Sequence, residues 1–299
     1  MNKKNYLSLA WFILGFGLSV FTRMSKLVPT IPMAILIAPV FILRFSRTQP
    51  VRRGNLLTLF GFYLSINIGL WWLYETNTLF NAVKILLLAL LYSLPFMIDG
   101  PIHEKFTENG ISSGLTTLTF PIISTAIHFL SSLEGFFEGT VQIGKFVFGP
   151  VILQQFLSLF GICGFIFIAS WFASTINYAW ENGFDWGKSR KIALTFAAVS
   201  LAIFVFGAVK TSSNKPERDT VTVAVDFNGN VLNQMDFADP GDGIMYAELP
   251  MQGVNTLYTR IGDVLGWICV VGLLGLVPIS IVLRFKLKKQ HRNLSKINI

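Results

Sequence analysis

Eight long apolar runs dominate the sequence and restrict the chain to folds that a lipid bilayer can accommodate. A bilayer core about 30 Å thick is crossed by a helix of roughly 20 mostly apolar residues. Only 13% of the residues are charged, whereas a soluble domain has about 25%. The sequence therefore predicts an all-α polytopic membrane protein with eight transmembrane helices. These predicted spans are Tyr6–Phe21, Val28–Leu43, Asn55–Tyr74, Leu79–Ile98, Leu115–Leu133, Ile152–Trp180, Ile192–Val209 and Val264–Leu283.

The basic residues predict how the chain is oriented. Sixteen of the 24 Lys and Arg residues fall on the side of the two termini, seven fall on the other side, and Lys84 lies inside a span. Because basic loops stay in the cytoplasm, both termini are expected to be cytoplasmic. No small-residue cleavage site follows the first apolar run, which favours an uncleaved first helix over a signal peptide. Contact with the headgroups of the phospholipid bilayer explains the net charge of +8, so no nucleic-acid partner is expected.

One sizeable extramembrane segment, Lys210–Asp263, joins the seventh and eighth predicted spans. It divides the chain into a seven-helix membrane domain (1–209), an outer segment (210–263), and a last helix with a basic tail (264–299). Two stretches in the outer segment alternate like strands around an Asn-Gly-Asn turn, which predicts a β-hairpin at Val221–Phe227 and Val231–Phe237. Since a lone hairpin is marginal in water, it should pack on the membrane domain or on another chain, or stay mobile.

Three stretches carry a resemblance to a known family. Gly69–Tyr74, with the sequence GLWWLY, closes the third span. Gln155–Gly164, with the sequence QFLSLFGICG, is followed by Asn177 in the sixth span. The third stretch comprises the hairpin sequence AVDFNGNVL, then Pro250, then TLYTRIGD directly before the eighth span. Together these stretches resemble the bacterial apolipoprotein N-acyltransferases, inner-membrane enzymes that add a third acyl chain to the N-terminal cysteine of lipoproteins. The likeness extends over essentially the whole chain.

The resemblance also implies what this chain lacks. Family members insert a nitrilase domain with a Glu, Lys, Cys triad between the seventh and eighth spans, where this chain has only the last hairpin. The outer segment contains no cysteine, and Cys163 and Cys269 lie in apolar spans, where a thiol is inert. No triad residue has a counterpart here. The chain is therefore expected to be an inactive scaffold by itself, which binds phospholipid or lipoprotein or docks a separate nitrilase-like subunit.

Four residues are candidates for contact with lipid at the outer interface. Trp71, Trp72 and Tyr74 end the third span, and Arg260 precedes the eighth. Aromatic rings favour the membrane interface in any membrane protein, so a plain aromatic belt is the alternative to a phospholipid-contacting wall. For Arg260, the alternatives are helix anchoring and contact with a lipid phosphate.

Five residues inside the spans are candidates for helix packing or for shaping a lipid portal. Gln155, Gly161, Gly164 and Asn177 place small and polar groups along the sixth span, and His128 lies in the fifth. Small residues let helices approach closely, and amides hydrogen-bond between them. An ionisable residue in a span is a functional hypothesis by default, although a neutral packing role is the simpler reading of His128.

No cofactor or metal is expected. His103, Glu104 and Glu108 fall in a predicted cytoplasmic loop, Asp99–Gly114, and they form only a weak candidate set of metal ligands. Phosphate-binding and hydrolase motifs are absent from the sequence. Two alternatives to the scaffold remain. One is a lipid transporter or flippase-like protein, which should gather polar residues on broken helices at mid-membrane. The other is the decayed product of an N-acyltransferase gene.

Overall fold

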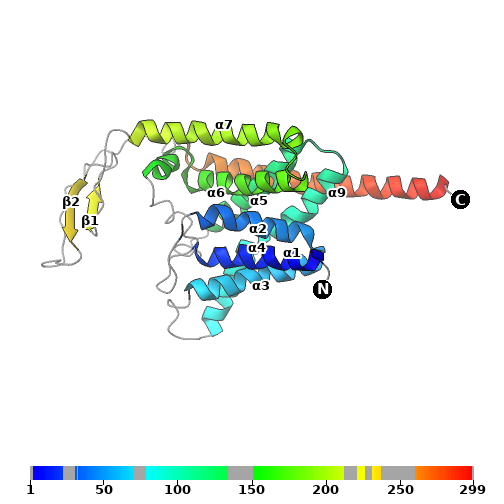
Figure 1. The fold of residues 1–299 in the computed structure, drawn as a ribbon, viewed down its shortest axis with the longest axis horizontal. Helices are drawn as coiled ribbons and strands as arrows, with labels where there is room; N and C mark the ends of the chain where they lie inside the picture. Colours follow the sequence, from blue (N-terminus) through cyan, green and yellow to red (C-terminus); the bar gives the residue numbers. More distant parts are fainter. Residues whose placement is uncertain are drawn as a thin grey trace.

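The computed structural model is an elongated bundle of helices (Figure 1). It describes residues 3–22, 31, 33–70, 79–133, 151–211, 221–225, 231–236 and 260–297. Each of the eight predicted apolar runs overlaps a helix. The helices are α1 (Lys3–Val20), α2 (Ala34–Thr48), α3 (Val51–Leu70), α4 (Leu79–Glu108), α5 (Ser113–Leu133), α6 (Val151–Glu181), α7 (Trp186–Thr211) and α9 (Val264–Ile297).

Four stretches of these helices are long and apolar enough to cross a membrane, among the residues described. They are Ala82–Glu108, Ser113–Leu133, Phe160–Glu181 and Val264–Phe285. The outer surface of the bundle is apolar as well, most clearly on α9, where the side chains of Val271 and Leu274 are 68% and 69% exposed. An apolar exterior is what a bilayer solvates, so the fold is that of a helical membrane protein.

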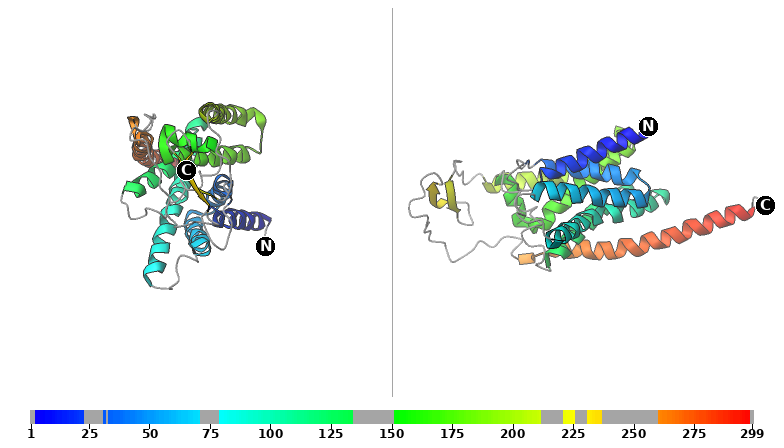
Figure 2. Two further views of the ribbon diagram at one scale, coloured as in Figure 1. Left: turned by 90° about the vertical axis from the view of Figure 1, so that its left-hand side faces the viewer. Right: turned by 90° about the horizontal axis from the view of Figure 1, so that it is seen from below.

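Helix α5 is the central element of the bundle. Most of its side chains are buried, and it packs against α4, α6 and α9. Helices α1, α2 and α3 pack on one another, and α2 also contacts α6. Viewed along the bundle, α1 and α9 lie on opposite sides, and α9 extends well past the other helices (Figure 2). The main apolar core therefore lies between the N-terminal helices and the α4–α6 layer, with Phe16, Leu43, Phe62 and Phe120 among its members.

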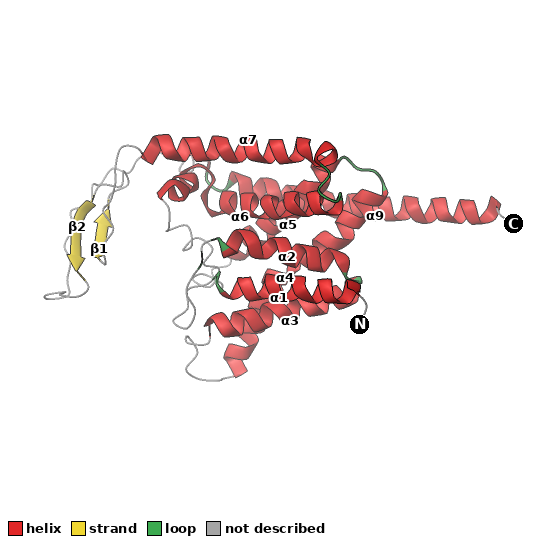
Figure 3. Ribbon diagram, in the orientation of Figure 1, coloured by secondary structure: helices red, strands yellow, loops and turns green. Residues whose placement is uncertain are grey.

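The two ends of the bundle differ in what they carry. Both chain termini lie at one end, and the paired strands project beyond the other (Figure 1). Strands β1 (Val221–Val225) and β2 (Val231–Asp236) are antiparallel, with Val221 opposite Asp236 and an irregularity between Ala224 and Val225 (Figure 3, yellow). The ends of the predicted strands, Phe227 and Phe237, and the turn between them lie outside the described residues.

Helix α4 corrects one prediction. The sequence placed a loop after Ile98, but α4 continues to Glu108, so His103, Glu104 and Glu108 lie on a helix. The helix stops two residues before Gly110, whose φ is +64°. There the amides of Gly110 and Ile111 donate to the carbonyls of Thr107 and Phe106, a glycine-dependent helix stop. The prediction was wrong because the helix continues past the end of the apolar run, where Asp99 pairs with Arg47 of α2.

Candidate functional site

A cluster of charged residues joins α2, α4 and α6 at the end of the bundle where the termini lie; Asp99 and His103 are buried, whereas Arg44 and Glu181 are partly exposed. We call it the charged cluster. It comprises Arg44, Arg47, Asp99, His103 and Glu181, with Thr119 of α5 bound to Asp99. These residues are far apart in the sequence, but the C-terminal ends of α2 and α6 lie beside the second half of α4 and the start of α5.

Arg47 and Asp99 form the most deeply buried pair of the cluster. Arg47 Nε lies 2.8 Å from Asp99 Oδ2, and a terminal guanidinium nitrogen lies 3.3 Å from Oδ1, so the contact is bidentate. The side chains are 4% and 0% exposed. The Thr119 hydroxyl adds a hydrogen bond to Asp99 Oδ1 at 2.9 Å. Such planar two-point pairing is what allows two charges to remain buried.

Glu181 ends α6 and is shared among three cationic or ionisable groups. Its Oε1 lies 3.4 Å from Arg47 and 3.8 Å from Arg44, and its Oε2 lies 3.1 Å from His103 Nε2. Burial lowers the pKa of Arg47, but the carboxylates of Asp99 and Glu181 outweigh burial and raise that pKa above its ordinary value. Arg47 therefore stays charged, and the cluster fixes the end of α6 to α2 and α4.

Arg44 is held by aromatic rings more than by hydrogen bonds. Its guanidinium carbon lies 5.4 Å from the ring centre of Trp11 on α1 and 5.5 Å from that of Trp180 on α6. The two rings contact each other edge to face at 5.7 Å. Cation–π contacts of this length are attractive, so Arg44 links α1, α2 and α6 at one point.

Asn177 lies one helical turn before Glu181 and makes a second polar link between α6 and α2. Its side-chain amide is fully buried and donates to the backbone carbonyl of Val40 at 2.9 Å and to that of Ala173 at 3.0 Å. This geometry fits a packing role. Gly164 is buried in the same helix. The side chain of Gln155 lies outside the described residues.

Gly161 interrupts α6. Its φ of 60° and ψ of −161° are not helical, and the helix is kinked there. Such backbone angles are accessible essentially only to glycine. In the structure Gly161 is buried and bends α6.

His128 is buried in the middle of the bundle. Its Nδ1 lies 2.7 Å from the backbone carbonyl of Ser124. Because a carbonyl only accepts, Nδ1 carries the proton of this hydrogen bond. The ring stands edge-on to Tyr92 of α4 at 5.5 Å. Its Nε2 is buried without a hydrogen-bond partner in the described part of the chain.

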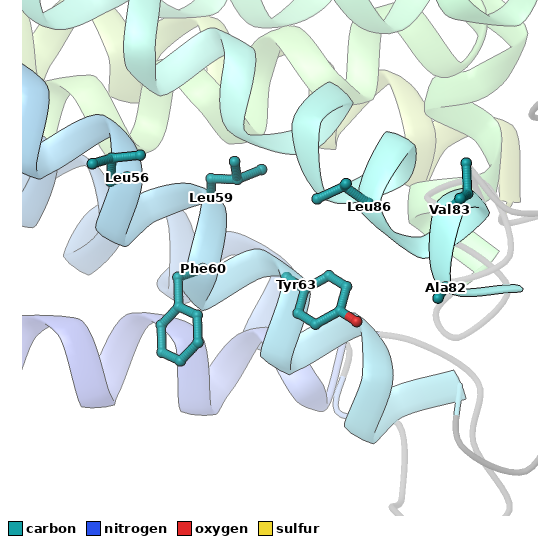
Figure 4. A pocket seen from close by; sticks show the side chains of 7 residues that line it. All are labelled: Leu56, Leu59, Phe60, Tyr63, Ala82, Val83 and Leu86. Carbon is teal, nitrogen blue, oxygen red and sulfur yellow. The ribbon is translucent and has the colours of Figure 1, made fainter. Parts of the chain in front are cut away.

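An apolar groove opens on the surface between the middle of α3 and the first turns of α4. It has a volume of about 370 Å³ and is lined by Leu56, Leu59, Phe60, Tyr63, Ala82, Val83 and Leu86. Figure 4 shows Val83 and Leu86 of α4 across from the α3 side chains. The Tyr63 hydroxyl is the one polar side-chain group in this lining. Leu56 and Phe60 are more than half exposed, so the groove opens laterally toward whatever surrounds the bundle.

The remaining predicted site residues are the four candidates for lipid contact. Trp71, Trp72 and Tyr74 lie outside the described residues, and Arg260 is exposed just ahead of α9. Cys163 and Cys269 are free, buried thiols. No group of three His, Cys, Asp or Glu residues suited to a metal ion occurs among the residues described.

Comparison with known proteins leaves the sequence resemblance untested: no protein-family model, no curated protein and no solved structure matches the chain. Sequence reasoning also missed the charged cluster. The available signal was Asp99 directly after a long apolar run and Arg47 just past another, since ionisable residues at such positions need a partner.

Proposed function

We propose that this chain is a multi-pass scaffold of the bacterial cytoplasmic membrane, similar to the membrane part of the apolipoprotein N-acyltransferases. In this proposal all eight helices span the bilayer, with both termini in the cytoplasm. The scaffold binds the acyl chain of a phospholipid or lipoprotein and presents the β1–β2 pair to a separate nitrilase-like subunit. It does not catalyse acyl transfer alone. The observation that carries the proposal is the groove between α3 and α4.

The chemistry of the groove fits an acyl chain. Six of its seven lining residues are purely apolar, and its volume of about 370 Å³ is within the range of about 300–1,000 Å³ typical of small-molecule sites. A groove that opens sideways into a bilayer admits a lipid without passage through water. The Tyr63 hydroxyl offers a single polar contact at its edge, which suits an ester carbonyl.

The position of the strands supports the docking part of the proposal. The β1–β2 pair lies beyond the end of the bundle opposite the termini (Figure 1), which is the extracytoplasmic side in the proposed orientation. Two strands alone are marginally stable in water, and their outer edges carry backbone groups that another sheet can pair with. A nitrilase-like sheet extended by these strands would stand above the membrane scaffold.

The test is reconstitution of acyl transfer from two chains. The chain is expressed alone and with candidate extracytoplasmic nitrilases from the same source, and conversion of diacyl to triacyl lipoprotein is followed by mass. We expect no conversion by the lone chain and conversion by a matching pair. Activity of the lone chain would overturn the scaffold proposal, and inactivity with every candidate nitrilase would overturn the docking part.

A groove-filling variant tests the role of the groove itself. Val83→Trp places a large ring where a lipid chain should lie, and Val83 is already 48% exposed, so folding should be preserved. Leu274→Trp on α9 is the matched control, because it adds the same ring to an exposed apolar surface away from the groove. We expect cross-linking of a phospholipid with a photoreactive acyl chain to α3 and α4 to fall in Val83→Trp and to persist in Leu274→Trp.

A lipid transporter or flippase-like protein is the second candidate, and one observation favours it. Helix α6 is interrupted at Gly161, as transporter helices are around their sites. The charged cluster, however, lies at one end of the bundle and not at its middle. Proteoliposomes that carry the chain and move a fluorescent phospholipid between leaflets faster than empty liposomes would favour this candidate over the scaffold.

A further inference from the structure

Arg44 differs from the other arginine of the charged cluster, because its hydrogen-bonding capacity is unused among the residues that the structure describes. Arg47 donates to Asp99 through two nitrogens and to Glu181 through a third. The Arg44 guanidinium donates no hydrogen bond within the described residues. The nearest carboxylate oxygen is 3.8 Å away, on Glu181, which is too long for a hydrogen bond. Its Nε is buried and also lacks a partner there.

The guanidinium of Arg44 is nevertheless held in a fixed place. The rings of Trp11 and Trp180 lie against it at 5.4 and 5.5 Å, and they brace each other edge to face. Its side chain remains 17% exposed. A planar cation that is positioned by aromatic faces, and whose N–H groups meet no acceptor in the described part of the chain, is prepared to bind an acceptor without losing much side-chain entropy.

The surrounding charge favours an anion. Helices α1, α2 and α3 contain no Asp or Glu, and the first acidic residue of the chain is Glu75. The Glu181 carboxylate, which lies closest to Arg44, is already engaged by Arg47 and His103. Arg52 and Arg53 at the start of α3 add exposed positive charge at the same end of the bundle.

The position of Arg44 along α2 favours a lipid as the source of the anion. It follows directly after the predicted span that ends at Leu43, and tryptophan rings are enriched at the depth of the headgroups. Guanidinium groups bind phosphate oxygens through paired N–H donors. We propose that Arg44, bracketed by Trp11 and Trp180, binds the phosphodiester of a phospholipid headgroup at the terminus-bearing face of the bundle. This site is separate from the α3–α4 groove and does not depend on acyl transfer.

The test measures headgroup binding by the full-length chain purified in detergent. Dioctanoyl phosphatidylglycerol is titrated and tryptophan fluorescence is followed, since two of the chain's indole rings border the site. We expect Arg44→Gln to raise the Kd about tenfold or more, which corresponds to the loss of charged hydrogen bonds. Arg52→Gln removes the same charge from an exposed position and should change the Kd less than twofold. Dioctanoylglycerol, which lacks phosphate, should not compete.

Three outcomes of this binding experiment would contradict the proposal. Equal weakening in Arg44→Gln and Arg52→Gln would show general charge attraction and overturn the site. Competition by inorganic phosphate at the same concentration as the lipid would overturn the headgroup assignment in favour of a soluble phosphate. If Arg44→Gln does not fold, Arg44→Lys replaces it, because an ammonium keeps the charge but lacks the planar donors. Unchanged affinity in Arg44→Lys would then contradict the proposal.

Discussion

Replacement of Asp99 by leucine leaves the Arg47 guanidinium buried without its main partner. The Arg47 side chain is 4% exposed and Asp99 is fully buried, so water cannot replace the lost carboxylate. Removing one member of such a pair typically costs about 3–5 kcal/mol of folding free energy. We expect Asp99→Leu to fall in that range. Arg47→Met should lie at its lower end, because the Asp99 carboxylate keeps the hydrogen bond from Thr119 at 2.9 Å.

The double variant separates the interaction from simple loss of side chains. When Arg47→Met and Asp99→Leu are combined, no unpaired charge remains at this position. The single proton of the Thr119 hydroxyl is then donated to the Thr116 carbonyl, which lies 2.9 Å away, and Glu181 keeps its contact with His103. Apolar replacement of a whole buried ion pair is often neutral or stabilising. The double variant should therefore be less destabilised than either single variant.

Equilibrium unfolding of the purified chain in detergent micelles, followed by tryptophan fluorescence and by circular dichroism, gives the three free-energy differences. Arg52→Met is the control, since this exposed arginine should change stability by less than about 0.5 kcal/mol. Single-variant losses below about 1 kcal/mol, or a double-variant loss equal to the sum of the singles, would refute the reasoning. Either result would mean that the pair is not buried as a unit.

Three further variants test the packing of the bundle, each by the same unfolding measurement. Gly15→Ala should destabilise the fold by about 1–3 kcal/mol, because the added Cβ would lie 2.7 Å from the side chain of Ile42. Gly17→Ala is the control and should be tolerated, since a Cβ there meets no atom within 4 Å. Equal effects of the two variants would contradict the close approach of α1 and α2. Gly161→Ala should cost about 1–3 kcal/mol because an L side chain is strained at that φ, and an unchanged midpoint would mean that α6 is not bent there. Asn177→Leu should cost about 0.6–1.7 kcal/mol, the range for interhelical hydrogen bonds in membrane proteins; no loss would mean that the bond to α2 contributes nothing to stability.

The sequence was sufficient for the helices because their signal is local. The length of an apolar run can be read directly from the sequence and predicts a helix, and a glycine such as Gly110 can end a helix through the conformation of its own backbone. Both kinds of information lie within a few residues of one another. Where the prediction failed, at the end of α4, the deciding interaction was not local: Asp99 reads as a loop residue until Arg47, 52 positions earlier, is placed beside it.

For the candidate site residues as well, the sequence identified the residues but not the contacts that they make. Asn177 and His128 could be selected from the sequence, because a polar side chain in an apolar run is visible there. Their roles were not visible, since these depend on the Val40 carbonyl for Asn177 and on the Ser124 carbonyl and the Tyr92 ring for His128.

The sequence by itself determined that this chain is a helical membrane protein and approximately where its helices lie, because hydrophobic burial in a bilayer is set by composition along the chain. Tertiary structure alone decided which polar groups meet. The α3–α4 groove and the charged cluster both arise where helices distant in sequence pack together. In the interior of the bundle, an ionisable group such as Asp99 takes its chemical character from the partner that another helix supplies.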